Sequence, residues 1–185
     1  NTAKYKYFYK LDYKLDPKKI LNELEQNLQY PMFVKPANLG SSIGISKCKN
    51  REELDGAIEI ASNYDNRILV EESVEDNIEV NCAVLVNTDY QVASKIEYPK
   101  SWSDFLSFDE KYIQRNKSAN SKISDIKTEN KQKIKPKQKE ISILTTEIEE
   151  KVKQIAKNAF KIFNCNGVVR IDFLVERKTE KIYLN

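Results

Sequence analysis

The sequence predicts an α+β protein, and two observations lead to this class. Up to residue 71, patterns typical of strands and helices follow one another in the order strand, helix, hairpin, helix, strand. Further on, long strand patterns at 77–86 and 168–175 lie on either side of one amphipathic helix pattern. Hydrophobic residues make up 40% of the 185 residues, so the chain can bury a core in one or two lobes.

The first elements are a strand and a helix. Aromatic residues alternate with lysines over residues 5–13, which predicts a strand. Asp16 and Pro17 then indicate a helix start, because Asp caps a first turn and Pro fits its first position. Four residues give this helix one apolar face: Ile20, Leu21, Leu24 and Leu28.

A hairpin with a Gly/Ser tip follows at residues 31–46. Mostly apolar residues run into Lys35, and the turn contains Gly40, Ser41, Ser42 and Gly44. Backbone amides and hydroxyls of such a loop can surround an anion, and Lys35 can add a positive charge. A plain tight turn with an exposed lysine explains these residues equally well. The loop is neither a Walker A motif nor a dinucleotide-binding fingerprint.

The middle of the chain predicts a capped helix followed by strands. Asn50 and Glu53 have the spacing of a capping box, and the apolar stripe behind them is Leu54, Ala57, Ile58 and Ala61. Strands are expected at 67–71, 77–86 and 91–98. Glu71 and Glu79 stand near the ends of two of these strands, and taken alone each is typical of a solvated strand end.

The last part predicts a helix over 145–163 and two strands. Thr145 or Thr146 caps the helix, Gly167 is expected as its left-handed cap, and its stripe is Ile148, Val152, Ile155, Ala159 and Ile162. Arg170 and Asp172 share one face of the strand at 168–175, because residues two apart in a strand point the same way. They either pair with each other or serve a site. A final strand is expected at 181–185.

Composition excludes several classes of function. The chain has no histidine, so histidine-based acid–base chemistry is excluded within it, and its net charge of +3 is too small to argue for nucleic acid. No apolar run reaches the ~20 residues of a membrane span, and the first residues do not resemble a signal peptide. Three widely spaced cysteines fit a reducing compartment rather than a disulfide framework or a zinc site.

The stretch 113–140 is basic and poor in apolar residues. Its net charge is +6, and such a segment buries too little surface to order itself. Two interpretations remain open: a mobile lid that closes over a polyphosphate, or a disordered basic loop.

Three segments carry a family resemblance. Residues 33–46 read FVKPANLGSSIGIS, residues 71–79 read EESVEDNIE, and residues 167–173 read GVVRIDF. They resemble the D-alanine–D-alanine ligases of the ATP-grasp superfamily, and the likeness extends over essentially all 185 residues. The resemblance implies an ATP-grasp fold, in which two α+β lobes hold ATP between antiparallel sheets. The first lobe would cover 1–77 and the second 78–185, with 113–140 as the mobile loop.

The resemblance also implies roles for particular residues. Lys35, Gly40, Ser41, Ser42 and Lys111 would contact the ATP phosphates. Glu71 and the backbone of Glu72, Ser73 and Val74 would bind adenine, and Glu79 would bind the ribose hydroxyls. Asp172 would bind Mg²⁺ or Mn²⁺, Arg170 would stabilise the oxyanion of the intermediate, and Tyr112 is a candidate on the substrate side. Pro136-Lys137 departs from the Pro-Ala common in the family, which puts the lid's substrate contacts in doubt.

The implied activity is ligation of D-alanine to a second D-amino acid for peptidoglycan synthesis, in the cytoplasm. We expect the chain to be part of a longer enzyme, because a family substrate domain and an Asn-Glu-x-Asn metal segment are not within these residues. Alone it is expected to be inactive; the full enzyme could be a homodimer. The alternatives are another ATP-grasp carboxylate–amine ligase and a non-catalytic basic interaction module.

Overall fold

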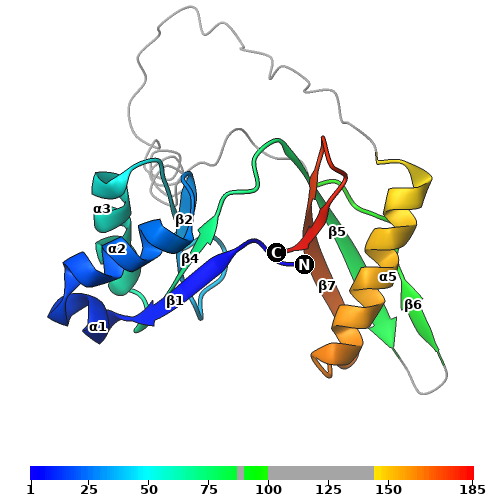
Figure 1. The fold of residues 1–185 in the computed structure, drawn as a ribbon. Helices are drawn as coiled ribbons and strands as arrows, with labels where there is room; N and C mark the ends of the chain where they lie inside the picture. The colour runs from blue at the N-terminus through cyan, green and yellow to red at the C-terminus, as the bar shows by residue number, and fades with distance from the viewer. Residues whose placement is uncertain (87–89, 100–143) are drawn as a thin grey trace, which may run out of the picture.

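The computed structural model describes residues 1–86, 90–99 and 144–185. It contains two antiparallel sheets of four strands each, and helices cover one face of each sheet (Figure 1). We call each sheet with its helices a lobe. The expected lid at 113–140 lies outside the described residues, as do Lys111 and Tyr112.

The first lobe comprises the first seven elements of the chain. Its sheet has the order β1-β4-β2-β3. These strands are β1 (Tyr5–Tyr9), β2 (Met32–Pro36), β3 (Ser46–Cys48) and β4 (Arg67–Glu72), and the helices are α1 (Lys10–Leu15), α2 (Pro17–Asn27) and α3 (Arg51–Ser62).

Two helix starts in this lobe form as predicted. The Asp16 carboxylate accepts a hydrogen bond from the Lys19 N–H (3.0 Å) at the start of α2. Asn50 caps α3, because the Glu53 N–H donates to Asn50 Oδ1 (2.9 Å), and the Glu53 carboxylate accepts from the N–H of Lys49, the residue before the cap (2.8 Å). The predicted apolar faces of both helices are buried.

The prediction of a strand over 5–13 is wrong in its second half. The chain leaves the sheet after Tyr9 and forms α1, because the Lys10 N–H bonds the Asn66 carbonyl (2.8 Å) where β1 ends. Tyr13 is buried there and its hydroxyl donates to Asp55 of α3. The helical conformation of α1 is therefore supported by a hydrogen bond from Tyr13 to a residue 42 positions away in the sequence.

The second lobe has the sheet order β6-β5-β7-β8, and helix α5 packs against this sheet. Its elements are β5 (Asn77–Val86), β6 (Gln91–Ala93), α5 (Thr146–Ile162), β7 (Val168–Glu176) and β8 (Ile182–Leu184). The strand expected at 91–98 is shorter than predicted. Beyond Ala93 the Ser94 hydroxyl accepts from the Ala83 N–H (3.0 Å) and the Ser94 N–H donates to the Ala83 carbonyl (2.8 Å), after which an isolated bridge joins Glu97 and Asn81.

The end of α5 corrects two further predictions. Asn164, with φ 50°, occupies the left-handed position expected for Gly167. The Cys165 N–H bonds the Phe160 carbonyl and the Asn164 N–H bonds the Lys161 carbonyl, both at 3.0 Å, which is a Schellman motif. The helix turns Phe160 into the core instead of Ile162, which is 79% exposed.

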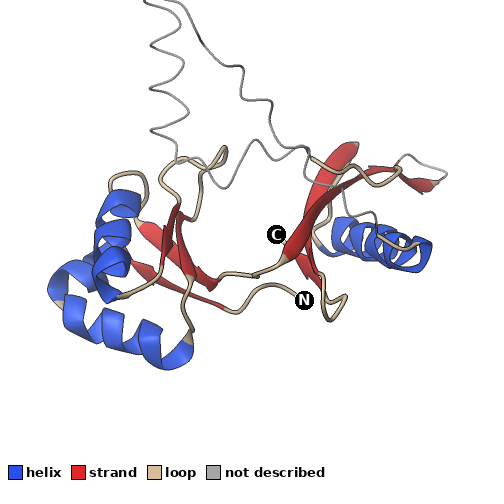
Figure 2. Ribbon diagram, turned by 90° about the horizontal axis from the view of Figure 1, so that it is seen from above, coloured by secondary structure: helices blue, strands red, loops and turns tan. Residues whose placement is uncertain are grey.

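Each lobe has its own hydrophobic core between sheet and helices. Alternate strand residues face the helices and are buried, among them Met32, Val34, Ile68 and Val70 in the first lobe and Val80, Cys82, Phe173 and Val175 in the second. The helices lie on the outer sides, so the helix-free faces of the two sheets are turned toward one another (Figure 2).

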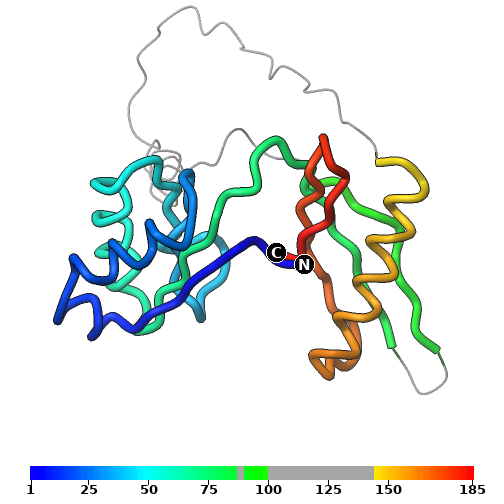
Figure 3. Tube along the Cα trace, in the orientation of Figure 1, coloured from blue at the N-terminus to red at the C-terminus, as the bar shows by residue number. Residues whose placement is uncertain are grey.

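Among the described residues, two stretches of chain join the lobes. One is the linker 73–76 between β4 and β5. The other is the N-terminal stretch, which runs from β1 to the second sheet, where Thr2 forms a parallel bridge with Leu184 (Figure 3). Among the helices of the described residues, none has the length and apolarity needed to cross a membrane.

Candidate functional site

The helix-free faces carry most of the residues that the sequence singles out. In β2 and β4 the buried residues alternate with Lys35 and Glu71. In β5 and β7 they alternate with Glu79, Arg170 and Asp172. Because the period of a strand is two, these five side chains leave the two sheets on the sides that face each other.

On the first lobe, Lys35 and Glu71 form an ion pair between neighbouring strands. The Lys35 ammonium donates to Glu71 Oε1, and the side chains are only 21% and 16% exposed. The Phe33 ring lies on the same face, with the Lys47 ammonium 5.5 Å and the Lys35 ammonium 6.0 Å from its centroid. Cations are attracted to an aromatic face, so this surface combines an apolar ring with two ammonium groups.

The Gly/Ser loop has an unusual backbone. Ser41 (φ 57°) and Ser42 (φ 60°) both have a left-handed backbone conformation. Residues other than glycine seldom adopt it, and such residues cluster at ligand-binding loops. Gly44 (φ 69°) must be glycine for a second reason, because a Cβ there would lie 2.7 Å from the Tyr64 ring. Gly40 is exposed, and its carbonyl accepts from the Ile43 N–H (3.2 Å).

Asp65 anchors the strand end that leads into this loop. Its carboxylate accepts hydrogen bonds from the Arg67 N–H (3.1 Å) and from the Asn38 N–H (2.7 Å) and Nδ2 (2.9 Å). These N–H groups, that of Arg67 most of all, lower the pKa of the Asp65 carboxyl. The loop is thus held at its base while its tip stays exposed.

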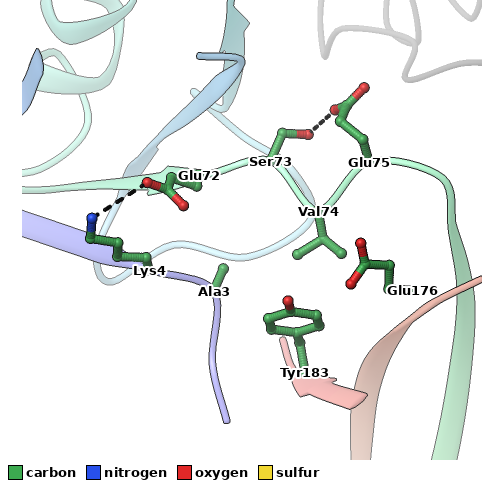
Figure 4. A pocket seen from close by; sticks show the side chains of 8 residues that line it. All are labelled: Ala3, Lys4, Glu72, Ser73, Val74, Glu75, Glu176 and Tyr183. Carbon is green, nitrogen blue, oxygen red and sulfur yellow. Dashed lines mark hydrogen bonds and ion pairs between the residues drawn. The ribbon is translucent and has the colours of Figure 1, made fainter. Parts of the chain in front are cut away.

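The linker lines a cleft between the lobes, shown in Figure 4. Its volume is about 230 Å³, and it is lined by Ala3, Lys4, Glu72, Ser73, Val74, Glu75, Glu176 and Tyr183. Glu176 and Tyr183 come from the second lobe and lie across from Val74 and Ala3. Glu72 is held by the Gln29 N–H (3.0 Å) and by an ion pair with Lys4 (3.8 Å).

Each half of the linker is tied to a different lobe. Glu75 forms an ion pair with Lys47 of β3 (2.7 Å) and accepts from the Ser73 hydroxyl, and the hydrogen bond from Lys47 lowers the pKa of the Glu75 carboxyl. The next residue, Asp76, forms an ion pair with Arg177 (3.3 Å), which follows β7. The ion pairs of the linker therefore change from the first lobe to the second between Glu75 and Asp76.

On the second lobe, Arg170 and Asp172 pair with each other. Arg170 Nε lies 3.0 Å from Asp172 Oδ1, and the side chains are 64% and 41% exposed. Glu79 is exposed on the neighbouring strand, opposite Leu174. Of the two interpretations of Arg170 and Asp172, mutual pairing is therefore present, and it leaves both groups accessible for a ligand.

Asp172 offers an accessible carboxylate to a metal ion. In the described ranges no three acidic or cysteine side chains come together as a metal centre. One accessible carboxylate nevertheless suits Mg²⁺, which proteins often hold through one or two carboxylates together with phosphate oxygens. The residues present therefore fit a metal bound jointly with a nucleotide.

Sequence reasoning missed Lys47, Glu75 and Asn81. Asn81 faces Asp172 across the β5–β7 pair, and Lys47 faces Phe33 across β2–β3. The alternation rule could have found Asn81, because it is two residues from Glu79 in one strand. The position of Lys47 also depends on the register of β2 and β3. The pairing of Glu75 with Lys47 had no local signal, since 28 residues separate them.

Comparisons with known proteins agree on one family. The model of the family described as "D-ala D-ala ligase C-terminus" matches residues 1–143 and 138–185. The D-alanine--D-alanine ligase of Caldicellulosiruptor bescii is 37% identical over 177 residues, which are 96% of this chain and 43% of the relative. That of Enterococcus hirae is 39% identical over 177 residues, 95% of this chain and 43% of the relative. The chain thus spans less than half the length of these curated relatives.

Solved structures show the same fold. The VanG D-Ala:D-Ser ligase from Enterococcus faecalis has a TM-score of 0.69 and 25% identity, with 100% of this chain and 46% of that chain covered. The D-alanine–D-alanine ligase from Helicobacter pylori has a TM-score of 0.64 at 22% identity, covers 100% of this chain and 44% of that one, and supports the fold alone. The prediction of an α+β ATP-grasp fold is confirmed.

Proposed function

Because this chain belongs to the D-Ala–D-Ala ligase C-terminus family, we propose that it supplies the ATP-binding lobes of an ATP-dependent D-alanine–D-alanine ligase. The observation that carries this proposal is the set of charged residues on the two facing sheet surfaces. A lysine and a glutamate project from one surface, and an arginine, an aspartate and a glutamate project from the other. We also propose that the two lobes are separate domains that divide at residue 77.

In this proposal the first lobe binds most of the nucleotide. Lys35 lies on the strand that leads into the Gly/Ser loop, so Lys35 and the loop residues Gly40, Ser41 and Ser42 would hold the phosphates. Glu72 at the end of β4 and the linker residues Ser73 and Val74 line the interlobe cleft, and their backbone, with Glu71, would bind adenine. Glu79 would accept hydrogen bonds from two ribose hydroxyls, as a carboxylate can.

The second lobe would supply the groups that act on developing charge. Asp172 would hold Mg²⁺ or Mn²⁺, which neutralises phosphate charge when bound. Arg170, which is 64% exposed, can turn from Asp172 toward an oxyanion between the lobes. Lys111 and Tyr112, outside the described residues, keep their proposed roles as a phosphate contact and a substrate-side residue.

The proposed reaction has two steps. A carboxylate oxygen of D-alanine attacks the γ-phosphorus of ATP, and ADP leaves. The amine of a second D-amino acid then attacks the acyl carbon of the resulting acylphosphate, phosphate leaves with the electron pair of the broken C–O bond, and the amine loses a proton. The product is a dipeptide for peptidoglycan synthesis. We further propose a cytoplasmic location and a homodimer for the whole enzyme.

The test is ATP affinity in two lysine variants. We expect Lys35→Ala to weaken ATP binding about 10- to 100-fold, since a hydrogen bond to a charged group contributes about 1.5–3 kcal/mol. Lys49→Ala is the matched control, because Lys49 is exposed just beyond β3 and should change the affinity little. Titration calorimetry measures both, and equal affinities would remove the phosphate role of Lys35.

The second substrate has more than one candidate. The likeness to a structure called a D-Ala:D-Ser ligase favours D-serine as an alternative to D-alanine, and D-lactate is a third. ADP release by the whole enzyme with D-alanine and each candidate would separate them. Release that requires a different carboxylic acid would identify another ATP-grasp ligase instead.

A further inference from the structure

The two oxygens of the Asp172 carboxylate are held unequally. Oδ1 accepts from Arg170 Nε at 3.0 Å, whereas the contact of Oδ2 is a longer one, 3.4 Å from the other end of the same guanidinium. Oδ2 can therefore bind a cation at a lower cost in free energy than Oδ1, because only the longer contact with Arg170 is lost. The question is what holds the carboxylate in place if Arg170 moves away.

Asn81 supplies a second donor to the same oxygen. It lies directly opposite Asp172 in the β5–β7 register, on the helix-free face. When its amide is oriented to pair donors with acceptors, Nδ2 lies 2.9 Å from Asp172 Oδ1 and 3.2 Å from the Val80 carbonyl oxygen. The opposite orientation would set the amide oxygen against two other oxygens, which is unfavourable.

The backbone of Asn81 is fixed as well. Its N–H donates to the Glu97 carbonyl (2.8 Å), and its own carbonyl accepts from the Glu97 N–H (2.9 Å). Both backbone groups of Asn81 are thus bonded to Glu97 at one edge of β5, and at the other edge Asn81 faces Asp172 of β7. The amide therefore projects from a rigid position, and it carries no charge that would compete with a cation for Asp172.

We propose that Asn81 is a positioning residue for Asp172: it holds Oδ1 from the neighbouring strand and leaves Oδ2 for a divalent cation bound with a nucleotide. This inference rests on the proposed function. Asn81 allows Arg170 to leave the pair while the carboxylate keeps its orientation. Without Asn81, the only side-chain donor that the described part of the chain offers to this carboxylate is the guanidinium that the proposed reaction needs elsewhere.

The test is Mn²⁺ binding to the protein saturated with a non-hydrolysable ATP analogue, followed by electron paramagnetic resonance. Asn81→Leu keeps a similar volume and removes the donor. We expect its Mn²⁺ affinity to fall about tenfold, the lower end of what loss of an outer ligand partner costs, while its affinity for the analogue without metal stays unchanged. Asn81→Gln, which keeps an amide, should recover part of the loss.

Gln91→Leu is the matched control. It also removes one amide hydrogen bond of the second lobe, from Gln91 Nε2 to the Lys157 carbonyl (3.1 Å), but away from Asp172. Its Mn²⁺ affinity should equal that of the unsubstituted protein. Equal Mn²⁺ affinity in Asn81→Leu, with loss of binding in Asp172→Asn, would overturn the inference and leave the proposed function standing. Unchanged Mn²⁺ affinity in Asp172→Asn would overturn both.

Discussion

The two lobes present similar charge pairs in different settings. Lys35 and Glu71 belong to neighbouring strands, and their side chains are 21% and 16% exposed. Arg170 and Asp172 belong to one strand, two residues apart, and are 64% and 41% exposed. A charge that is taken from water depends on its partner far more than an exposed charge does. In the first lobe, Lys35 and Glu71 therefore depend on each other. In the second lobe, Arg170 and Asp172 can exchange each other for another partner at little cost.

This difference suits a division of labour between the lobes. A half-buried lysine keeps a fixed position, which is useful for binding a phosphate whose charge is present from the start. An exposed arginine and aspartate can change partners at little cost, which is useful where charge develops during a reaction. Three predictions test how far the lobes differ.

The largest effect is expected from two glycine substitutions. Gly44 and Gly167 have almost the same φ, 69° and 68°, but a Cβ at Gly44 would lie 2.7 Å from Tyr64, and a Cβ at Gly167 would have no atom within 4 Å. We expect Gly44→Ala to lower the free energy of unfolding by about 3 kcal/mol, from backbone strain plus overpacking. Gly167→Ala should cost only the strain, about 1 kcal/mol.

Urea denaturation measures both glycine variants. The double variant Gly44→Ala, Tyr64→Ala serves as the control, because it removes the ring that the new methyl group meets. Equal losses in the two single variants would mean that packing around the Gly/Ser loop is no tighter than at the start of β7.

An intermediate effect is expected when the acidic partner of each pair is removed. Glu71→Ala leaves the Lys35 ammonium half-buried without its carboxylate, and it should cost about 2 kcal/mol of stability. Asp172→Ala leaves an exposed arginine, and it should cost no more than about 0.5 kcal/mol. Thermal unfolding without ligand measures both, and a larger loss for Asp172→Ala would reverse the comparison.

The smallest effect is expected at the linker, as a function of pH. Lys47 holds the pKa of the Glu75 carboxyl below its usual value. The contribution of this pair to stability is therefore fully present above the pKa of an unfolded glutamate, about 4.3, and is lost as the pH falls through the lower folded value. The difference in urea midpoint between the protein and Lys47→Met should shrink below about pH 4.

The control for the linker prediction is Lys18→Met. Lys18 is exposed on α2, and its replacement should give no pH-dependent difference of this kind. A difference for Lys47→Met that stays constant from pH 7 to pH 3 would contradict the role of Glu75.

Most of the fold could be predicted from the sequence because local signals agree with tertiary packing. The caps at Asp16 and Asn50 and the lysine strand formed where their chemistry indicates. The errors fall where a distant residue decides. Alternation over 5–13 predicts one strand, yet Tyr13 lies in a helix and its hydroxyl donates to Asp55. Nothing within those residues reveals that partner.

The sequence predicts on which face of a strand each candidate residue lies, but it does not predict how exposed that residue is or what it contacts. Strand alternation alone predicts that Arg170 and Asp172 share a face. It does not predict that Lys35 is shielded while Arg170 is exposed, since exposure depends on neighbouring strands. Alternation places Asn81 on the face of Glu79, but it could not predict the contact of the Asn81 amide with Asp172, which belongs to a strand about 90 residues further along the chain.

The double crossing between the lobes restricts how they can move. The linker and the N-terminal stretch run beside each other, joined where the Glu72 N–H bonds the Lys4 carbonyl (2.9 Å), and Thr2 is then fixed to Leu184. A rotation of the lobes about an axis along these two stretches would keep the bridge between Thr2 and Leu184. A twist of one lobe about a single stretch would break that bridge. Rotation of the lobes about this axis would therefore preserve which residues of the two sheets lie opposite each other.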